Sequence, residues 1–164
     1  MFSTIWVGRS GQPLNVVTGI DAALNGLSYN GTSTQRPNQI LSSVESPIRS
    51  QSCSPAPCVN WFNLGAFTQP ATGTYGNAGY DNVLGPWFWE WDEAVSRDFR
   101  IRESQTFQIR AEAFNVTNSV RLGNPGTTLS QSATFGRILN SAASLNGNTG
   151  GGARVMQFAV KYIF

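Results

Sequence analysis

The feature that most constrains the fold is a sustained alternation of apolar and charged residues between Gly85 and Asn118. The odd positions carry the apolar side chains, which are Trp87, Trp89, Trp91, Val95, Phe99 and Ile101, followed by Phe107, Ile109, Ala111 and Ala113. The even positions carry most of the charged ones. Successive side chains of a β-strand point to opposite faces, so this pattern predicts two strands, at 87–101 and 106–115, with one apolar and one polar face.

The length of these two runs narrows the choice of architecture. They span about ten to fifteen residues, whereas strands of globular proteins average about five or six, and a tilted strand that crosses a membrane needs about nine to eleven. One apolar face opposite one polar face fits a soluble sheet packed on a core and equally a membrane barrel. Length favours the barrel, and alternation alone leaves both open.

The end of the chain repeats the pattern and predicts another strand at 154–164. Its alternate positions are apolar or aromatic, namely Met156, Phe158, Val160, Tyr162 and Phe164. This ending resembles the C-terminal strand of bacterial outer-membrane barrels. The resemblance implies that these five residues form the signal read by the barrel assembly machinery of that membrane.

Four segments together resemble a more particular family: GNAGYDNVLGPWFWEWD, FRIRESQTFQIRAEAFNVTN, ATFGRIL and MQFAVKYIF. They are similar to the end of the TonB-dependent receptor-like barrels of the Oar-like type, which carry an N-terminal carboxypeptidase-regulatory-like domain. The resemblance implies an all-β fold, an antiparallel meander of about four long strands with long loops that forms a sector of a transmembrane β-barrel. It further implies uptake of a nutrient across the cell outer membrane.

The same resemblance sets the expected partners. Outer-membrane lipid would surround the wall, and the remaining barrel strands and a plug domain would lie upstream of Met1, together with the segment that touches TonB. Met1 to Ser10 has no basic region followed by a hydrophobic block, so it is not a signal peptide. We therefore expect a C-terminal segment of a longer protein, and whether that segment is natural or truncated stays open.

The rest of the chain is punctuated by turns. Residues 2–18 alternate weakly around Gly11-Gln12-Pro13 and predict one further, interrupted strand. Residues 19–86 and 116–153 lose all periodicity and are rich in Asn, Ser, Gly and Pro, which predicts two long loops. Loops of this length are typical of the extracellular side of outer-membrane barrels.

Composition excludes several functions. The net charge is +2 and the arginines are scattered, so no nucleic-acid footprint is expected. Cys53 and Cys58 are the only cysteines and there is no histidine. Two cysteines alone do not make a zinc site, so we expect no metal and no cofactor. The pair could form a disulfide in an oxidising compartment, with two free thiols as the alternative.

Three tryptophans on the apolar face, Trp87, Trp89 and Trp91, predict an aromatic girdle at a membrane interface. Glu90 and Asp92 lie beside them and could suggest sugar chemistry, but nothing supplies an opposing wall for a pair of carboxylates. We therefore expect no enzyme. The alternative from another class is a secreted β-sandwich that binds carbohydrate through the three tryptophans.

The polar face predicts a ladder of cross-strand charge pairs that lines a barrel lumen, made by Asp92, Asp98, Arg100, Arg110 and Glu112. Apolar residues are odd-numbered on both strands, which predicts a loop with an odd number of residues and excludes a two-residue turn. A three-residue loop of residues 103–105 would set Asp98 opposite Arg110, whereas a loop of residues 102–104 would set it opposite Gln108. We expect the first, because it brings opposite charges together. Glu93 and Arg97 break the pattern on the apolar face, where a mid-membrane arginine costs roughly 2–4 kcal/mol.

Overall fold

The computed structural model describes residues 1–27, 34–49, 53, 58–141 and 152–164. The chain divides into two compact units. Unit 1 consists of residues 1–10, 87–121 and 142–164, and unit 2 of residues 11–86 and 122–141. Each unit has its own architecture and is described by itself.

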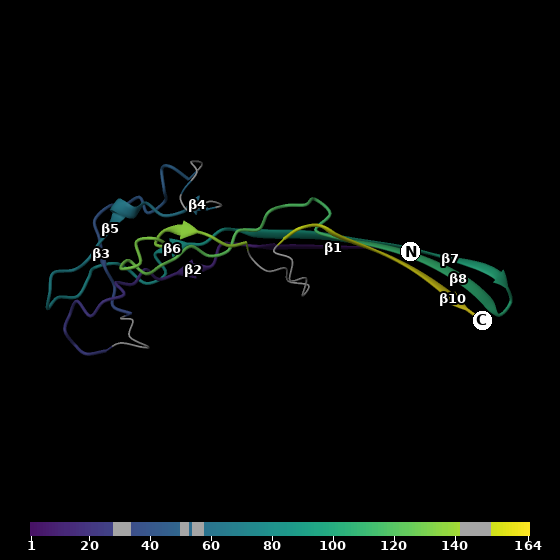
Figure 1. Cartoon of the computed structure of the whole chain (residues 1–164), viewed down its shortest axis with the longest axis horizontal. Coiled ribbons are helices and arrows are strands. Elements are labelled where there is room, and N and C mark those ends of the chain that lie inside the picture. The colour runs from purple at the N-terminus through teal and green to yellow at the C-terminus, as the bar shows by residue number, and fades with distance from the viewer. Residues whose placement is uncertain (28–33, 50–52, 54–57, 142–151) are drawn as a thin grey trace. The chain divides into compact units, whose positions relative to one another are not determined.

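Unit 1 is a single antiparallel sheet of four strands in the order β1-β7-β8-β10. These strands run side by side in Figure 1. Their bounds are β1 Phe2–Arg9, β7 Phe88–Arg102, β8 Gln105–Phe114 and β10 Val155–Ile163. Three of them begin and end within one residue of the predicted bounds, because the alternation that predicts them continues to their ends.

The first strand is shorter than predicted. β1 ends at Arg9, and the segment that follows it forms β2, Pro13–Leu14, which pairs with β6, Val83–Leu84, in unit 2. The predicted interrupted strand over 2–18 is therefore two strands, and the second of them belongs to unit 2. The break lies at Gly11-Gln12-Pro13, where proline removes a backbone donor from the ladder. Gly11 also lies so close to the Gly85 carbonyl that a Cβ would fall 2.0 Å from its oxygen.

The pairing fixes which side chains share a face of the sheet. Facing residues such as Trp6 and Trp91, or Tyr162 and Phe107, lie on the same side. We call this side the apolar face; it carries Phe2, Trp6, Trp89, Trp91, Val95, Phe99, Phe107, Ile109, Met156, Phe158, Val160 and Tyr162. The polar face on the other side carries Arg9, Glu90, Asp92, Asp98, Arg100, Gln108, Arg110, Glu112 and Lys161.

The β7–β8 hairpin corrects the predicted register. Arg102 pairs with Gln105, which leaves a two-residue turn of Glu103 and Ser104. Ladder pairing is irregular between Arg100 and Arg102, so Ile101 is an extra residue in a β-bulge. A two-residue turn plus one bulged residue keeps the odd residues of both strands on one face. The exclusion of a two-residue turn was wrong because it assumed a regular ladder.

The consequence is a different set of cross-strand neighbours. Asp98 faces Gln108, and Arg110 faces Ser96, so the predicted Asp98–Arg110 pair does not form. The Gln108 side chain instead donates a hydrogen bond to Asp98 Oδ1 at 2.7 Å. An amide donor thus partners the carboxylate where an arginine was expected.

Unit 2 is built from residues 11–18 of the predicted first strand and from segments that were predicted as loops, and it has a hydrophobic core. Short antiparallel pairs join β2 to β6, β3 (Asn38–Gln39) to β5 (Phe67–Thr68), and β4 (Val59–Asn60) to β9 (Arg137–Ile138). A 3₁₀ turn, η1, spans Leu64–Ala66. The core residues are Val16, Phe62, Ala66, Phe67, Val83 and Phe135. Phe67 and Phe135 meet edge to face with ring centroids 6.0 Å apart, a favourable aromatic geometry.

Asp21 organises one turn of unit 2. Its carboxylate accepts the backbone N–H groups of Asn25 at 3.1 Å and Gly26 at 2.8 Å and the Gln35 amide at 2.6 Å. The Gly26 hydrogen bond is the main reason why the pKa of the Asp21 carboxyl is lowered from its ordinary value; burial is the next largest effect and works in the other direction. In the part of the chain that the structure describes, no helix is long and apolar enough to cross a membrane.

Candidate functional site

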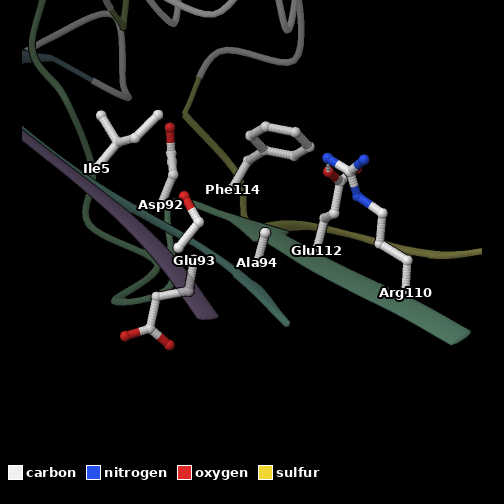
Figure 2. A pocket seen from close by; sticks show the side chains of 8 residues that line it. Ile5, Asp92, Glu93, Ala94, Arg110, Glu112 and Phe114 are labelled. Atoms are coloured by element: carbon white, nitrogen blue, oxygen red, sulfur yellow. Dashed lines mark hydrogen bonds and ion pairs between the residues drawn. The ribbon is translucent and has the colours of Figure 1, made fainter. Parts of the chain in front are cut away.

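A hollow of about 350 Å³ opens on the polar face of unit 1. Its lining comes from three strands, with Ser3 and Ile5 from β1, Asp92, Glu93 and Ala94 from β7, and Arg110, Glu112 and Phe114 from β8. Figure 2 shows Asp92, Glu112 and Phe114 on one side of the sheet, while the Glu93 side chain points away from them. Glu93 therefore contributes to the hollow through its backbone.

The charges of the polar face do not pair across strands as predicted. Arg110 forms an ion pair with Glu112 on its own strand, two residues along, where side chains share a face. Asp98 lies opposite Gln108 and Arg100 opposite Thr106. All five predicted ladder residues lie on the polar face, but no ion pair among the described residues joins them from strand to strand.

Asp92 has a different partner, in the segment that follows β8. The Asn115 backbone N–H donates to Asp92 Oδ1 at 2.9 Å, and both residues are buried. Asn115 has a φ of 52°, in the left-handed region that asparagine tolerates better than most residues. Its side-chain amide donates to the carbonyls of Ser119, at 3.0 Å, and of Gly152. Asn115 therefore links β7 to residues near both ends of the 116–153 segment, Ser119 and Gly152.

A buried ion pair involves Glu90, which precedes Asp92 by two residues on β7 and lies on the same face. Arg121 Nη1 is 3.0 Å from Glu90 Oε2, and the two side chains are 3% and 2% exposed. The Arg121 guanidinium is also 5.6 Å from the centre of the Phe88 ring, with the Arg9 guanidinium 5.3 Å from the same ring. These contacts hold the segment after β8 against the polar face.

Sequence reasoning did not find the roles of Asn115 and Arg121, because they lie in a segment without periodicity. The sequence did contain one indication of a turn here. Asn115 and Thr117 are residue types whose side chains form hydrogen bonds with nearby backbone groups and favour turns. The structure shows such a turn, in which Asn115 Oδ1 accepts the Ser119 N–H at 3.0 Å. No periodic rule could have paired Arg121 with Glu90.

The apolar face presents its side chains to the surroundings. Trp6 is 67% exposed and Phe158 is 74% exposed. Trp87 is 69% exposed and lies just before β7. Trp91 Nε1 donates to the Thr4 hydroxyl at 2.8 Å, so this indole has a polar partner at its edge. All five residues of the predicted assembly signal are exposed, and Tyr162 stacks on Phe164 with ring centroids 6.1 Å apart.

The two charged residues of the apolar face do not neutralise each other. Four residues of strand separate Glu93 from Arg97, roughly 13 Å at the usual rise per residue, and no ion pair among the described residues joins them. The Arg97 guanidinium lies 5.2 Å from the centre of the Phe99 ring.

Unit 2 contains the two cysteines. Cys53 and Cys58 are joined by a disulfide with their Cα atoms 5.6 Å apart, and residues 54–57 between them lie outside the described part of the chain. Among the described residues, no group of three or more His, Cys, Asp or Glu side chains could hold a metal ion.

A long antiparallel sheet with one exposed apolar face and one charged, hollowed face defines the wall of a membrane-spanning β-barrel. Four strands form only a sector of such a wall, since the smallest natural barrels have about eight. The chain matches the outer membrane beta barrel domain over residues 1–157, and it belongs to that family. It is therefore a protein of the cell outer membrane. Nothing among the curated proteins or the solved structures matches it.

Proposed function

We propose that the chain is the C-terminal wall segment of a TonB-dependent receptor-like transporter that takes up a nutrient, and that it acts without catalysing a reaction. The observation that carries the proposal is the polar face, with its hollow beside Asp92, Arg110 and Glu112. A charged, hollowed face suits a barrel wide enough to hold water or another part of the protein. A narrow barrel would fill its interior with packed side chains.

The partners of two carboxylates on the polar face also support a role without catalysis. Glu90 is held by Arg121 at 3.0 Å, and Asp92 accepts the Asn115 N–H at 2.9 Å. Both carboxylates therefore hold structure in place, which supports a wall rather than an acid–base pair. The proposed partners are outer-membrane lipid on the apolar face and, on the polar face, an upstream plug that receives energy through TonB.

The exposed apolar face disfavours the carbohydrate-binding β-sandwich. A sandwich buries one face of each sheet against the other, whereas Val95 and Val160 are 50% and 65% exposed here. Membership of the outer-membrane family points the same way. We therefore do not retain that alternative.

The experiment that tests the proposal measures uptake of a panel of candidate nutrients by cells that carry or lack the gene. We expect one nutrient whose uptake saturates and stops when a protonophore collapses the energy of the inner membrane. Deleting the cell's TonB should have the same effect. Uptake that persists after both treatments would identify a passive channel and contradict the proposal.

The proposed partnership with the assembly machinery has its own test. Deleting Phe164 removes the terminal aromatic residue, so we expect less of the protein in the outer membrane at equal synthesis, measured by immunoblot of membrane fractions. Deleting the exposed Tyr75 of unit 2 is the control and should leave the amount unchanged. An equal amount of protein without Phe164 would show that the ending is not read.

A further inference from the structure

Arg97 occupies an apolar part of the membrane-facing surface. It faces Ile109, and Ile109 faces Val160, so the three side chains form one row across the apolar face. Arg97 is exposed, and its guanidinium lies over Phe99, two residues nearer the β7–β8 turn. The charge of Arg97 therefore lies beside a ring on the hairpin side of its own position.

The β-bulge brings a second arginine to the same face. Arg102 faces Gln105, and directly facing residues share a face. Gln105 and Phe107 are two residues apart on β8, so they share a face, which is the apolar one. Arg102 faces Gln105 and therefore lies on the apolar face as well. Without the extra residue Ile101, the even-numbered Arg102 would fall on the polar face beside Arg100. The bulge thus redirects one cation, as bulges commonly do.

The two arginines flank a row of aromatic rings. Phe99 faces Phe107, and Phe107 faces Tyr162, so these rings lie at one level across three strands. Rings at one level are typical of the boundary between hydrocarbon and headgroups. The Arg97 guanidinium lies beside Phe99 of this row, and Arg102 lies three residues nearer the turn than Phe99. Neither joins an ion pair among the described residues, and the nearest carboxylate in sequence is the exposed Glu103.

We propose that Arg97 and Arg102 form a binding site for the phosphate of an anionic phospholipid in the leaflet next to the β7–β8 turn. Guanidinium groups bind phosphate oxygens through paired N–H donors. Short turns of these barrels are periplasmic, which assigns the lipid to the periplasmic leaflet. The exposed Val95, Ile109 and Val160 lie around Arg97, so the ligand that fits carries acyl chains along with its phosphate.

The test measures lipid that remains bound to the full chain after extraction from the membrane in detergent. Native mass spectrometry would compare retained phosphatidylglycerol with retained phosphatidylcholine. We expect the wild type to retain phosphatidylglycerol preferentially, and Arg97→Gln and Arg102→Gln each to reduce it about fivefold, the fold change of about 1 kcal/mol per arginine near an anionic surface. Arg100→Gln is the matched control, because Arg100 lies between them in sequence and faces Thr106 on the polar face.

Additional variants and controls distinguish a loss of lipid binding from a loss of folding, and lipid binding from the binding of free anions. The heat-dependent shift of the band on a gel would show that each variant is folded. Arg97→Lys should retain the lipid, and Arg97→Leu, which removes the charge from an apolar face, should lose it while remaining folded. Equal loss in Arg100→Gln, equal retention of the two lipids by the wild type, or displacement by inorganic phosphate alone would each overturn the proposal.

Discussion

At the scale of single residues, the pair of Glu90 and Arg121 shows how polar groups hold this wall. Desolvating two charges is expensive, and their attraction offsets that expense only when both remain. Both side chains are almost fully buried, and the guanidinium also lies against the Phe88 ring. The pair therefore fixes where the segment after β8 lies, and it stabilises that position only as long as both members are present.

Breaking this pair from one side should be far more harmful than replacing both partners. Glu90→Gln leaves the Arg121 charge buried and should lower the free energy of unfolding by about 3–5 kcal/mol. The double variant Glu90→Leu/Arg121→Met should recover most of that loss. Urea unfolding in lipid vesicles, followed by tryptophan fluorescence, measures both. As a control, Glu112→Gln breaks a more exposed pair and should cost less than about 1 kcal/mol. Equal losses at Glu90 and Glu112 would contradict this reasoning.

Asp21 gives a pH dependence at the same scale. Its pKa is lowered in the folded protein, chiefly by the Gly26 N–H, so the ionised carboxylate stabilises the turn. That stabilisation is fully present above the pKa of an unfolded aspartate, about 3.9. It is lost as the pH falls through the lower folded value.

We therefore expect Asp21→Asn to be less stable than the wild type at neutral pH and equal to it in strong acid. The Gly26 amide shift in NMR spectra should report a titration midpoint below about 3.9 in the wild type. A difference in stability that is the same at neutral and acidic pH would show that the carboxylate's charge plays no part.

At the scale of elements, the sequence predicts strands well and their register poorly. Alternation located three of the four strands of unit 1, because burial or lipid exposure of one face imposes a period of two on every residue. Register depends on the turn, and the observed pairing of Asp98 with Gln108 is the one that a loop of residues 102–104 gives. The bulge at Ile101 then shortens that loop to a two-residue turn. The residues 98, 103, 108 and 110 all carry polar side chains, so hydrophobicity could not choose between the two registers.

Engineered disulfides check the register directly. Residues that face each other have Cα atoms about 4.5–5.5 Å apart, within the range of a disulfide. The double variant Asp98→Cys/Gln108→Cys should therefore cross-link readily in the membrane. Asp98→Cys/Arg110→Cys is the control, since its diagonal distance of about 7–8 Å is too long. Peptide mapping under non-reducing conditions would identify the bond, and a dominant cross-link in the control would restore the register predicted from the sequence.

At the scale of the whole molecule, two units of different physical character share one chain. Unit 1 owes its order to strand pairing, and its apolar face is exposed. Unit 2 buries Phe62, Phe67 and Phe135 in a core of its own. That core was not predictable from the sequence, because its members come from distant, irregular segments without any period. Arg121 was missing from the predicted site for the same reason, because it too lies in an irregular segment without periodicity.

The open edges of unit 1 yield a prediction for the molecule in solution. Within the described sheet, β1 and β10 each have one neighbour, which leaves backbone donors and acceptors available along their outer edges. We expect the purified chain to be insoluble or oligomeric in plain buffer and dispersed in detergent, as measured by light scattering after size exclusion. A monodisperse monomer without detergent would contradict the placement of the apolar face in lipid.

The β2–β6 pair of unit 2 has a consequence for the time course of folding. The β7–β8 contact between Gln108 and Asp98 spans 10 residues, whereas the β1–β7 contact between Met1 and Ser96 spans 95. Closing the longer loop costs about 2 kcal/mol more in chain entropy. The Gly85 N–H, however, donates to the Gln12 carbonyl at 2.9 Å within unit 2. Once unit 2 has folded, the ends of that long loop are already together, and β1 can pair with β7 as rapidly as the strands of a hairpin.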